Sequence, residues 1–247
     1  MIILACYNIK GGVGKTSTAV NLAYLAATQG ERTLLWDLDP QGAASFYYRI
    51  KPRIKGGVNK LMAKKSELDD YIKGSDYDNL DVIPADFSYR NMDLLLDETG
   101  KPKKKLRKLL KSLEDEYDYI FLDCPPSVSL MTEAVFYASD IVLVPTIPTV
   151  LSLRTLEQVI GFCAEHDFRQ PQLMSFFSMA DRRKSMHRLI LENPPQLNID
   201  MLHSDVPYAS EVERMGVSRQ PLFCYAAGSR AAQAYLHLWN EIQERIE

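Results

Sequence analysis

The chain has 247 residues, of which 46% are hydrophobic and 25% are charged, and its net charge is −3. This length allows one large domain or two small ones, and the apolar content excludes an intrinsically disordered chain. With 29 basic and 32 acidic residues, the composition also argues against a protein coated in nucleic acid, although it leaves room for a local basic patch.

The cysteines lie far apart, and no two form a C-x-x-C pair, so neither a zinc knuckle nor a thioredoxin-type redox motif is supported. We expect reduced, buried thiols at Cys6, Cys124, Cys163 and Cys224. The apolar run at the start of the chain is too short for a signal peptide or a membrane span. These features predict a cytoplasmic protein.

The first elements predict a parallel sheet. Residues 2–7 form a continuous apolar run, which is typical of a strand buried on both faces. A glycine-rich turn follows, and residues 17–29 are predicted to form a helix that Gly30 ends. Residues 32–36 are a second apolar run. A strand, a helix and a strand in this order indicate a parallel arrangement.

The alternation continues along the chain. Strands are predicted at residues 80–83, 119–122, 141–144 and 173–177, and helices at residues 104–113, 151–166 and 229–246. Pro145 is expected to end the strand before it. We therefore predict one doubly wound α/β domain over residues 1–247, with a mostly parallel sheet and helices on both faces. Ligands of such sheets bind at the carboxyl ends of the strands.

A glycine-rich segment between the first strand and the first helix predicts a phosphate-binding loop of the P-loop NTPase type. Its residues are Lys10, Gly11, Gly12, Val13, Gly14, Lys15 and Thr16. Glycines let backbone N–H groups converge on an anion, and the helix N-terminus adds a favourable dipole. We expect Lys15 to reach the β- and γ-phosphates and Thr16 to ligate Mg²⁺, with Ser17 beside them. The first position of the usual G-x-x-x-x-G-K-[ST] pattern is Ile9 here.

Lys10 is an unusual second lysine, on the other shoulder of the loop from Lys15. It cannot easily fold back onto the same phosphates. One physical use is to reach the phosphates held by a second subunit and to supply transition-state charge in trans, as an arginine finger does. The alternative is a solvated lysine beside the loop.

The loop resembles the deviant Walker A motif of the ParA/MinD ATPases. Residues 37–42, Asp-Leu-Asp-Pro-Gln-Gly, are similar to the second motif of that family, and residues 119–126 to its Walker B strand. Further matches lie at residues 144–145, 151–154 and 228–236, so the resemblance covers nearly the whole chain in order. The Asp-Pro-Gln-Gly form is more similar to the ParA branch than to the MinD branch.

Carboxylates follow two of the predicted strands. Hydrolysis of a γ-phosphoryl group needs a metal ion and an aligned water molecule. Asp123 directly follows an apolar strand, so we expect it to hold Mg²⁺ through a water molecule, opposite Thr16. The resemblance implies that Asp39 orients or activates the attacking water. Asp37 is a candidate metal ligand with a secondary role, and the alternative for both residues is a turn-capping aspartate. Residues 125–133 are expected to form a switch that senses the γ-phosphate.

A basic cluster points to a polyanionic partner. It consists of Arg182, Arg183, Lys184 and Arg188, with no acid between them in the sequence. The resemblance to the ParA branch implies that this region binds DNA phosphates without base readout in the ATP-bound dimer, with Arg183 at the position of a DNA-binding arginine. The alternative is a solvated helix face. Residues 101–111 carry seven basic residues in eleven and are predicted to be a solvated surface, or else a DNA or partner contact.

One segment departs from the ParA pattern. After Val206-Pro207 the chain reads Tyr208-Ala209-Ser210-Glu211, where the family commonly has a basic and polar stretch. Part of the DNA surface or of the adenine pocket is therefore expected to differ. Pro207 is still expected to pack on the adenine ring.

These observations predict a small ParA-like ATPase with ATP and Mg²⁺ as cofactors. ATP is expected to bridge two subunits into a sandwich dimer that binds DNA nonspecifically and associates with the nucleoid. Slow hydrolysis, stimulated by a ParB-like or cargo-adaptor protein, would position a plasmid, a chromosome or a protein assembly. No helix-turn-helix precedes the phosphate loop, which argues against binding to a specific operator.

Two other functions stay open. A membrane-cycling ATPase of the MinD type needs a basic amphipathic terminal helix. An apolar stripe does run along the last predicted helix, at Ala231, Tyr235, Leu238, Ile242 and Ile246. Acidic residues near its end repel anionic lipid, so we favour a helix packed on the core and expect no membrane binding. A metabolic P-loop ligase that phosphorylates a small acid is the third class, and it would not need Lys10.

Overall fold

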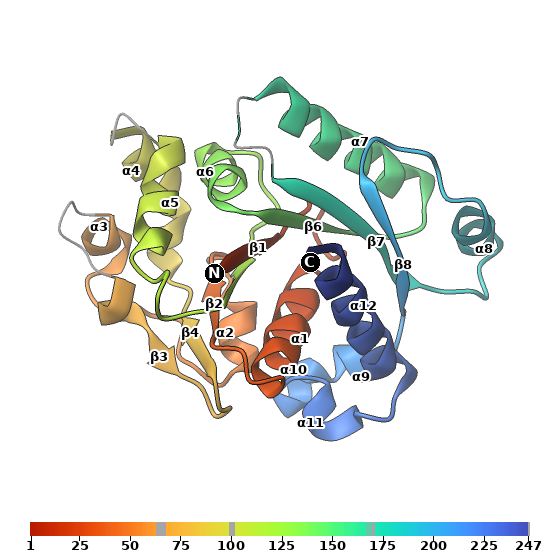
Figure 1. The fold of residues 1–247 in the computed structure, drawn as a ribbon, viewed down its shortest axis with the longest axis horizontal. Coiled ribbons are helices and arrows are strands. Elements are labelled where there is room, and N and C mark those ends of the chain that lie inside the picture. Colours follow the sequence, from red (N-terminus) through yellow and green to blue (C-terminus); the bar gives the residue numbers. More distant parts are fainter. Residues whose placement is uncertain (63–67, 99–101, 167, 169–170, 247) are drawn as a thin grey trace.

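The computed structural model describes residues 1–62, 68–98, 102–166, 168 and 171–246. Within these residues a sheet of eight strands runs through the centre, in the order β3-β4-β2-β5-β1-β6-β7-β8 (Figure 1). The strands are β1 (Ile2–Cys6), β2 (Thr33–Asp37), β3 (Lys73–Gly74), β4 (Leu80–Ile83), β5 (Tyr119–Asp123), β6 (Ile141–Thr146), β7 (Gln172–Ala180) and β8 (Asp200–Pro207). Each paired neighbour is parallel except β3 with β4, which is antiparallel. The predicted doubly wound α/β fold is confirmed.

Helices cover both faces of the sheet, and two apolar clusters fill the space between the layers (Figure 1). One face carries α3 (Gly57–Leu61), α4 (Met92–Glu98), α5 (Pro102–Lys111), α6 (Leu130–Ala138) and α7 (Val150–Glu165). The other carries α1 (Lys15–Thr28), α2 (Ala43–Tyr47), α10 (Met215–Ser218) and α12 (Arg230–Ile246). The remaining short helices are η1 (Leu68–Tyr71), η2 (Phe87–Asn91), α8 (Ser185–Glu192), α9 (Ser210–Glu213) and α11 (Phe223–Ala226).

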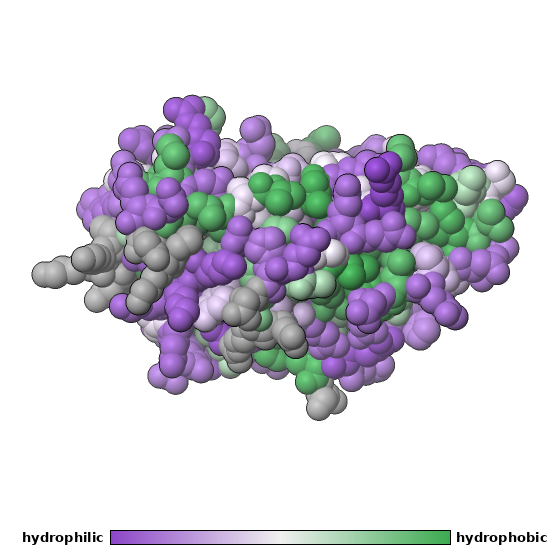
Figure 2. Space-filling model, turned by 90° about the horizontal axis from the view of Figure 1, so that it is seen from above, coloured by the Kyte–Doolittle hydropathy of each residue, from purple (hydrophilic) through white to green (hydrophobic). Residues whose placement is uncertain are grey.

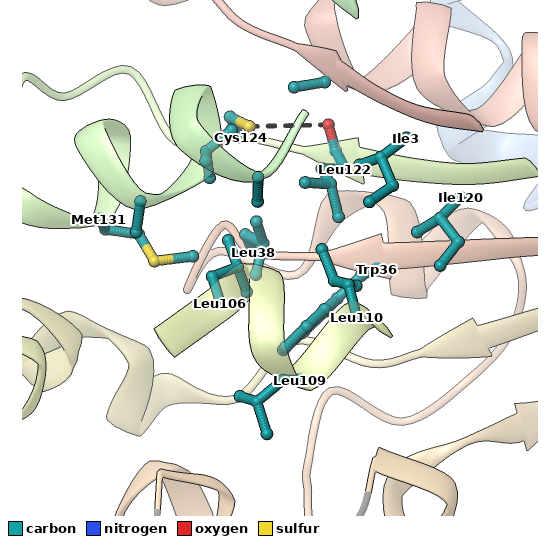
Figure 3. Close-up of a cluster of buried hydrophobic side chains, with 14 of the residues drawn as sticks. Ile3, Trp36, Leu38, Leu106, Leu109, Leu110, Ile120, Leu122, Cys124 and Met131 are labelled. Carbon is teal, nitrogen blue, oxygen red and sulfur yellow. Dashed lines mark hydrogen bonds between the residues drawn. The ribbon is translucent and has the colours of Figure 1, made fainter. Parts of the chain in front are cut away.

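Helix α5 shows how the sequence pattern directs packing. Leu106, Leu109 and Leu110 recur at helical spacing, and all three are buried. They pack over the sheet beside Trp36 of β2 and Leu122 of β5 (Figure 3). Lys104, Lys108 and Lys111 of the same helix are exposed. Apolar spacing, rather than helix propensity, therefore fixes the orientation of this strongly basic helix.

The terminal helix α12 also packs on the core. Tyr235, Leu238 and Ile242 of the predicted stripe are buried, and Ile246 packs partly buried against the same cluster. The apolar face of α12 is thus occupied by the sheet and by α1. No helix in the described parts of the chain is long and apolar enough to cross a membrane. The face shown in Figure 2 is mostly hydrophilic, with separate apolar patches.

Some details differ from the sequence predictions. Pro145 lies inside β6, which continues to Thr146. The pairing of β1 with β6 ends at Leu143, so the ladder on that side needs no N–H from Pro145. The Pro145 carbonyl accepts a hydrogen bond from the Asn8 side chain at 2.9 Å. The expectation of four buried thiols is wrong for Cys224, which is exposed, and for Cys163, which is half-buried.

Candidate functional site

The strand order brings the predicted carboxylates and the phosphate loop together. β5 lies between β1 and β2 in the sheet. The register aligns Asp123 at the end of β5 with Cys6 of β1 on one side and with Asp37 of β2 on the other. The loop after β1 therefore starts beside both aspartates, at the carboxyl edge of the sheet, where ligands of this fold bind.

The backbone of the loop needs glycine at its last turn. Gly14 precedes α1 with a φ of +95°, and a Cβ there would lie 2.8 Å from the Ser178 Oγ atom. Only glycine fits both conditions. Val13 is fully buried and anchors the loop in the core. The N-terminus of α1 thus opens into a cavity of about 340 Å³, which is suited to an anion.

The two lysines of the loop point in different directions. The Lys15 Nζ atom donates a hydrogen bond to the Lys10 carbonyl at 3.1 Å, on the inner side of the loop. Burial lowers the pKa of Lys15, and the negative charge of Asp123 opposes this shift. The Lys10 Nζ atom instead donates to the Ser152 Oγ atom at 3.2 Å, in the first turn of α7. Lys10 is therefore held away from the cavity that Lys15 faces.

Asn8 supports the loop and was not singled out from the sequence. It is fully buried, its amide donates to the Pro145 carbonyl at 2.9 Å, and its Oδ1 atom accepts the Lys10 N–H at 2.9 Å. It therefore ties the first turn of the loop to β6. A polar residue at the end of a continuous apolar strand was the available signal.

Asp123 is the most unusual group of the site. It is fully buried, and neither of its carboxylate oxygens has a hydrogen-bond partner among the described residues. Burial raises its pKa well above the ordinary value, Asp37 raises it further, and the Thr16 side chain opposes the rise. An unpaired buried carboxylate is costly unless a cation compensates it. One carboxylate and one hydroxyl next to a phosphate site are a donor set that fits Mg²⁺, which commonly completes its shell with phosphate and water.

The two aspartates after β2 have different environments. Asp37 is fully buried, and its Oδ2 atom accepts hydrogen bonds from the Ser45 N–H at 2.8 Å and the Ser45 hydroxyl at 2.7 Å. Burial raises its pKa to about 6, although the bonds from Ser45 counteract part of this effect. Asp37 therefore anchors α2. Asp39 is half-buried, accepts the Gln41 N–H at 2.9 Å and lines the cavity.

The far wall of the cavity suits an aromatic base. Pro207 lies in this wall, together with Val206, Tyr208 and Val212. Met179 also lines it, with a φ of +54° at the irregular end of β7. Apolar walls with a few polar groups are typical of nucleotide-sized pockets. From the sequence, only Pro207 was expected to pack on the base, because Met179 of β7 and Val212 of α9 come from separate elements.

The segment after β5 borders the same cavity. Pro126 lines it, and the Ser127 carbonyl accepts hydrogen bonds from the Tyr7 hydroxyl at 2.9 Å and from the Thr132 hydroxyl at 2.7 Å. Helix α6 begins at Leu130. The residues interpreted as a switch thus span a loop and the first turn of a helix.

In the structure, acidic side chains from outside the basic cluster neutralise part of its charge. Arg183 forms two hydrogen bonds with Asp181, at 2.8 and 3.0 Å, and Arg182 bonds Asp205 of β8 at 2.6 Å. No acid lies between the four basic residues in the sequence, but Asp181 and Asp205 pair with two of them in space. Lys184 and Arg188 are exposed at the start of α8 and in its first turns, and neither has an ion pair with any residue that the structure describes. Their positions share one face, as the spacing predicted.

The second basic segment is partly paired. Lys101 lies outside the described residues. Lys103 lies 3.4 Å from Glu133, and Arg107 lies 3.5 Å from Asp140. The exposed members of this segment are Lys104, Lys108 and Lys111.

The sheet topology and the glycine-rich loop at the N-terminus of α1 define a P-loop nucleotide-binding protein. Residues 1–173 match a family model described as an AAA domain. The chain is 32% identical to the sporulation initiation inhibitor protein Soj of Bacillus subtilis, with 97% of each protein covered. It is also 32% identical to the chromosome partitioning protein ParA of Caulobacter vibrioides, with 98% of this chain and 94% of that protein covered. The chain belongs to the ParA/MinD family of P-loop ATPases.

The fold is shared more widely than the family. Cobyrinic acid a,c-diamide synthase from Mycobacterium smegmatis, solved with a bound ATP analog and magnesium, matches with a TM-score of 0.80 at 23% identity. The match covers 97% of this chain and 93% of that one. At this identity the likeness concerns the fold alone.

Proposed function

We propose that this chain is a partition ATPase that binds ATP with Mg²⁺, forms an ATP-bridged dimer, binds DNA without sequence preference and positions a cargo. Its similarity to Soj and ParA supports this role. The observation that carries the proposal is the divergence of two lysines on one phosphate loop: Lys15 turns into the loop and Lys10 turns toward α7.

Within one protomer, Lys15 and the backbone of residues 11–14 would hold the phosphates, with Thr16 and Ser17 in the first turn of α1. Pro207 would pack on the base. The Asp123 carboxylate, which has no hydrogen-bond partner in the described part of the chain, and the Thr16 hydroxyl would hold Mg²⁺, which neutralises phosphate charge when it is bound. Asp37 stays engaged with Ser45 and supports the site from behind.

Two residues act on the reaction. The half-exposed carboxylate of Asp39 lies on the cavity wall, where it can accept a proton or a hydrogen bond from the attacking water. Lys10 cannot serve its own protomer while Ser152 holds it. A second protomer facing the loop would offer phosphate oxygens as stronger partners than a neutral hydroxyl, and Lys10 would then supply charge in trans.

The test of this arrangement is Lys10→Ala. We expect ATP-dependent dimerisation to be lost and turnover to fall about a hundredfold or more, because a trans cation is missing from the transition state. ATP affinity of the monomer should change by less than about twofold, since Lys15 is untouched. Sedimentation velocity and phosphate release are the measurements.

Ser152→Ala is the matched control. It removes the intramolecular partner of Lys10 but leaves the lysine, so dimerisation and turnover should persist. If Lys10→Ala kept both activities, the trans mechanism would fail and a metabolic P-loop enzyme would become the better description.

Nonspecific DNA binding is the second part of the proposal. With a non-hydrolysable ATP analogue, the protein should bind duplexes of unrelated sequence equally, and added salt should release them. Changing Arg183, Lys184 and Arg188 together to alanine should abolish this binding. Retained binding would reject the surface at α8. A ParB-like or cargo-adaptor protein should accelerate turnover of the DNA-bound dimer.

A further inference from the structure

A second cavity, of about 810 Å³, adjoins the nucleotide cavity. The two share one wall, formed by Pro207, Tyr208 and Ala209. Among the described residues, charged side chains of both signs line this second cavity. The basic ones are Arg182, Arg183 and Arg230, and the acidic ones are Asp181, Asp205 and Glu211. Their formal charges cancel.

Two of the arginines are already engaged. Arg183 directs Nε and Nη2 at the two carboxylate oxygens of Asp181, which also accepts the Arg183 backbone N–H at 3.1 Å. Arg182 directs Nη2 at Asp205. The guanidinium of Arg183 lowers the pKa of Asp181 to about 2, so this pair is fully charged near neutral pH. The Arg183 side chain is nonetheless 82% exposed and open to a ligand.

A phosphate group and a carboxylate use the same edge of a guanidinium. Both accept two parallel N–H bonds from Arg, and this bidentate geometry makes Arg a common phosphate ligand. A phosphate that enters the cavity must therefore displace Asp181 or Asp205, or accept the less favourable donors that remain. The carboxylates of Asp181 and Asp205 therefore compete with any polyanion for the guanidinium groups of the two arginines.

Arg230 is the exception among the three arginines. It is exposed in the first turn of α12, and no described residue forms an ion pair with it. A cation at a helix N-terminus does not stabilise the helix, since it opposes the macrodipole. Ser229 already caps the helix by accepting the Ala232 N–H at 3.2 Å. Helix stability therefore does not explain the position of Arg230, whereas an anion in the cavity does.

We propose that this cavity is a phosphodiester-binding site that the chain masks with its own carboxylates. Arg230, which forms no ion pair with any described residue, makes the first contact, and Asp181 and Asp205 compete with nucleic-acid phosphates for Arg183 and Arg182. The proposal rests on the nonspecific DNA binding proposed above. It adds that the two carboxylates lower the affinity of the cavity for DNA. Exposed ion pairs contribute little to stability, so the exchange is reversible at small cost.

The test removes the competitors. Asp181→Asn and Asp205→Asn keep the size and the hydrogen-bond acceptor of the side chain but remove its charge. Each should tighten binding of a random-sequence DNA duplex roughly three- to tenfold at about 100 mM salt, and should steepen the salt dependence by about one phosphate. Arg230→Ala should weaken binding and flatten the salt dependence by about one. Fluorescence anisotropy with a non-hydrolysable ATP analogue measures all of these.

Asp118→Asn is the matched control. Asp118 forms a comparable exposed ion pair with Arg32 at 2.7 Å, and its pKa is also lowered to about 2 by that arginine. It precedes β5, at the amino edge of the sheet, whereas the cavity borders the carboxyl end of β8. This variant makes the same change in net charge away from the cavity.

The outcomes separate the two proposals. If wild-type protein binds the duplex and the two cavity variants bind no tighter than Asp118→Asn, masking is wrong while DNA binding stands. If no variant and no wild-type protein binds the duplex even at low salt, DNA binding itself is wrong, and masking falls with it.

Discussion

Two neighbouring regions of this molecule differ in how their charged side chains are buried and paired. At the end of β5, Asp123 is fully buried and has no hydrogen-bond partner among the residues that the structure describes, and the nearby Lys15 is largely buried. In the cavity beside β8, Arg182 and Arg183 are exposed and paired with carboxylates. Charges interact strongly in a dry site and weakly in water, so a ligand that completes the first region gains much more than one that enters the second. On the proposed function, the comparison predicts firm binding of a nucleotide and looser binding of a polyanion.

The largest effect should come from removing the buried cation. Lys15→Ala takes away the positive charge inside the loop, and we expect ATP turnover to fall by about 10²–10³, as for other preorganised charged donors. Phosphate release and binding of a fluorescent ATP analogue measure the loss. Lys111→Ala, which changes an exposed lysine of α5, should leave both unchanged. Equal effects of the two variants would contradict the contrast between buried and exposed charge.

An intermediate effect is expected at the unpaired carboxylate. Asp123→Asn removes a buried charge, so the ligand-free protein should gain about 1 kcal/mol in free energy of unfolding. The extra stabilisation that Mg²⁺ gives to the ATP-bound protein should disappear. Thermal melts with and without Mg²⁺ measure both changes.

The control for this variant is Asp39→Asn, at a half-exposed carboxylate on the same cavity. It should leave the stability of the ligand-free protein nearly unchanged. If the ligand-free Asp123→Asn protein melted at a lower temperature than wild type, the Asp123 carboxylate would not be destabilising the ligand-free fold, and the prediction would be wrong.

The smallest effect belongs to an exposed pair. The Asp118 pKa is lowered to about 2 by Arg32, so the pair contributes stability above the ordinary aspartate pKa of about 4 and loses it as the pH falls toward 2. Asp118→Asn should therefore flatten the acid limb of stability between about pH 4 and pH 2. Because both side chains are substantially exposed, the change at neutral pH should be slight. An acid limb as steep as that of wild type would refute the assignment.

Local patterns predicted much of the fold and the centre of the site. The phosphate loop, the aspartates after β2 and β5, and the apolar stripes of α5 and α12 are all readable within a few residues of sequence. Contacts between distant segments were not readable. Ser152, which holds Lys10, lies 142 residues further along the chain.

Strand β8 was missed for a physical reason. It is one of the two edge strands of the described sheet, and only Leu202 and Val206 in it are buried. The strand therefore lacks the continuous apolar run that marks the central strands. Missing β8 also meant missing Asp205, and with it the neutralisation of Arg182. The masked cavity thus becomes visible only when β7 and β8 are placed side by side.

The wall of Pro207, Tyr208 and Ala209 has a consequence for the order of events in the proposed cycle. A nucleotide and a nucleic-acid strand would press on opposite sides of the same three residues. Binding linkage is reciprocal: if ATP raises the affinity for duplex DNA by some factor, DNA raises the affinity for ATP by the same factor. A DNA-bound protomer would then bind ATP more tightly than a free protomer, so DNA itself would favour the ATP-bound state.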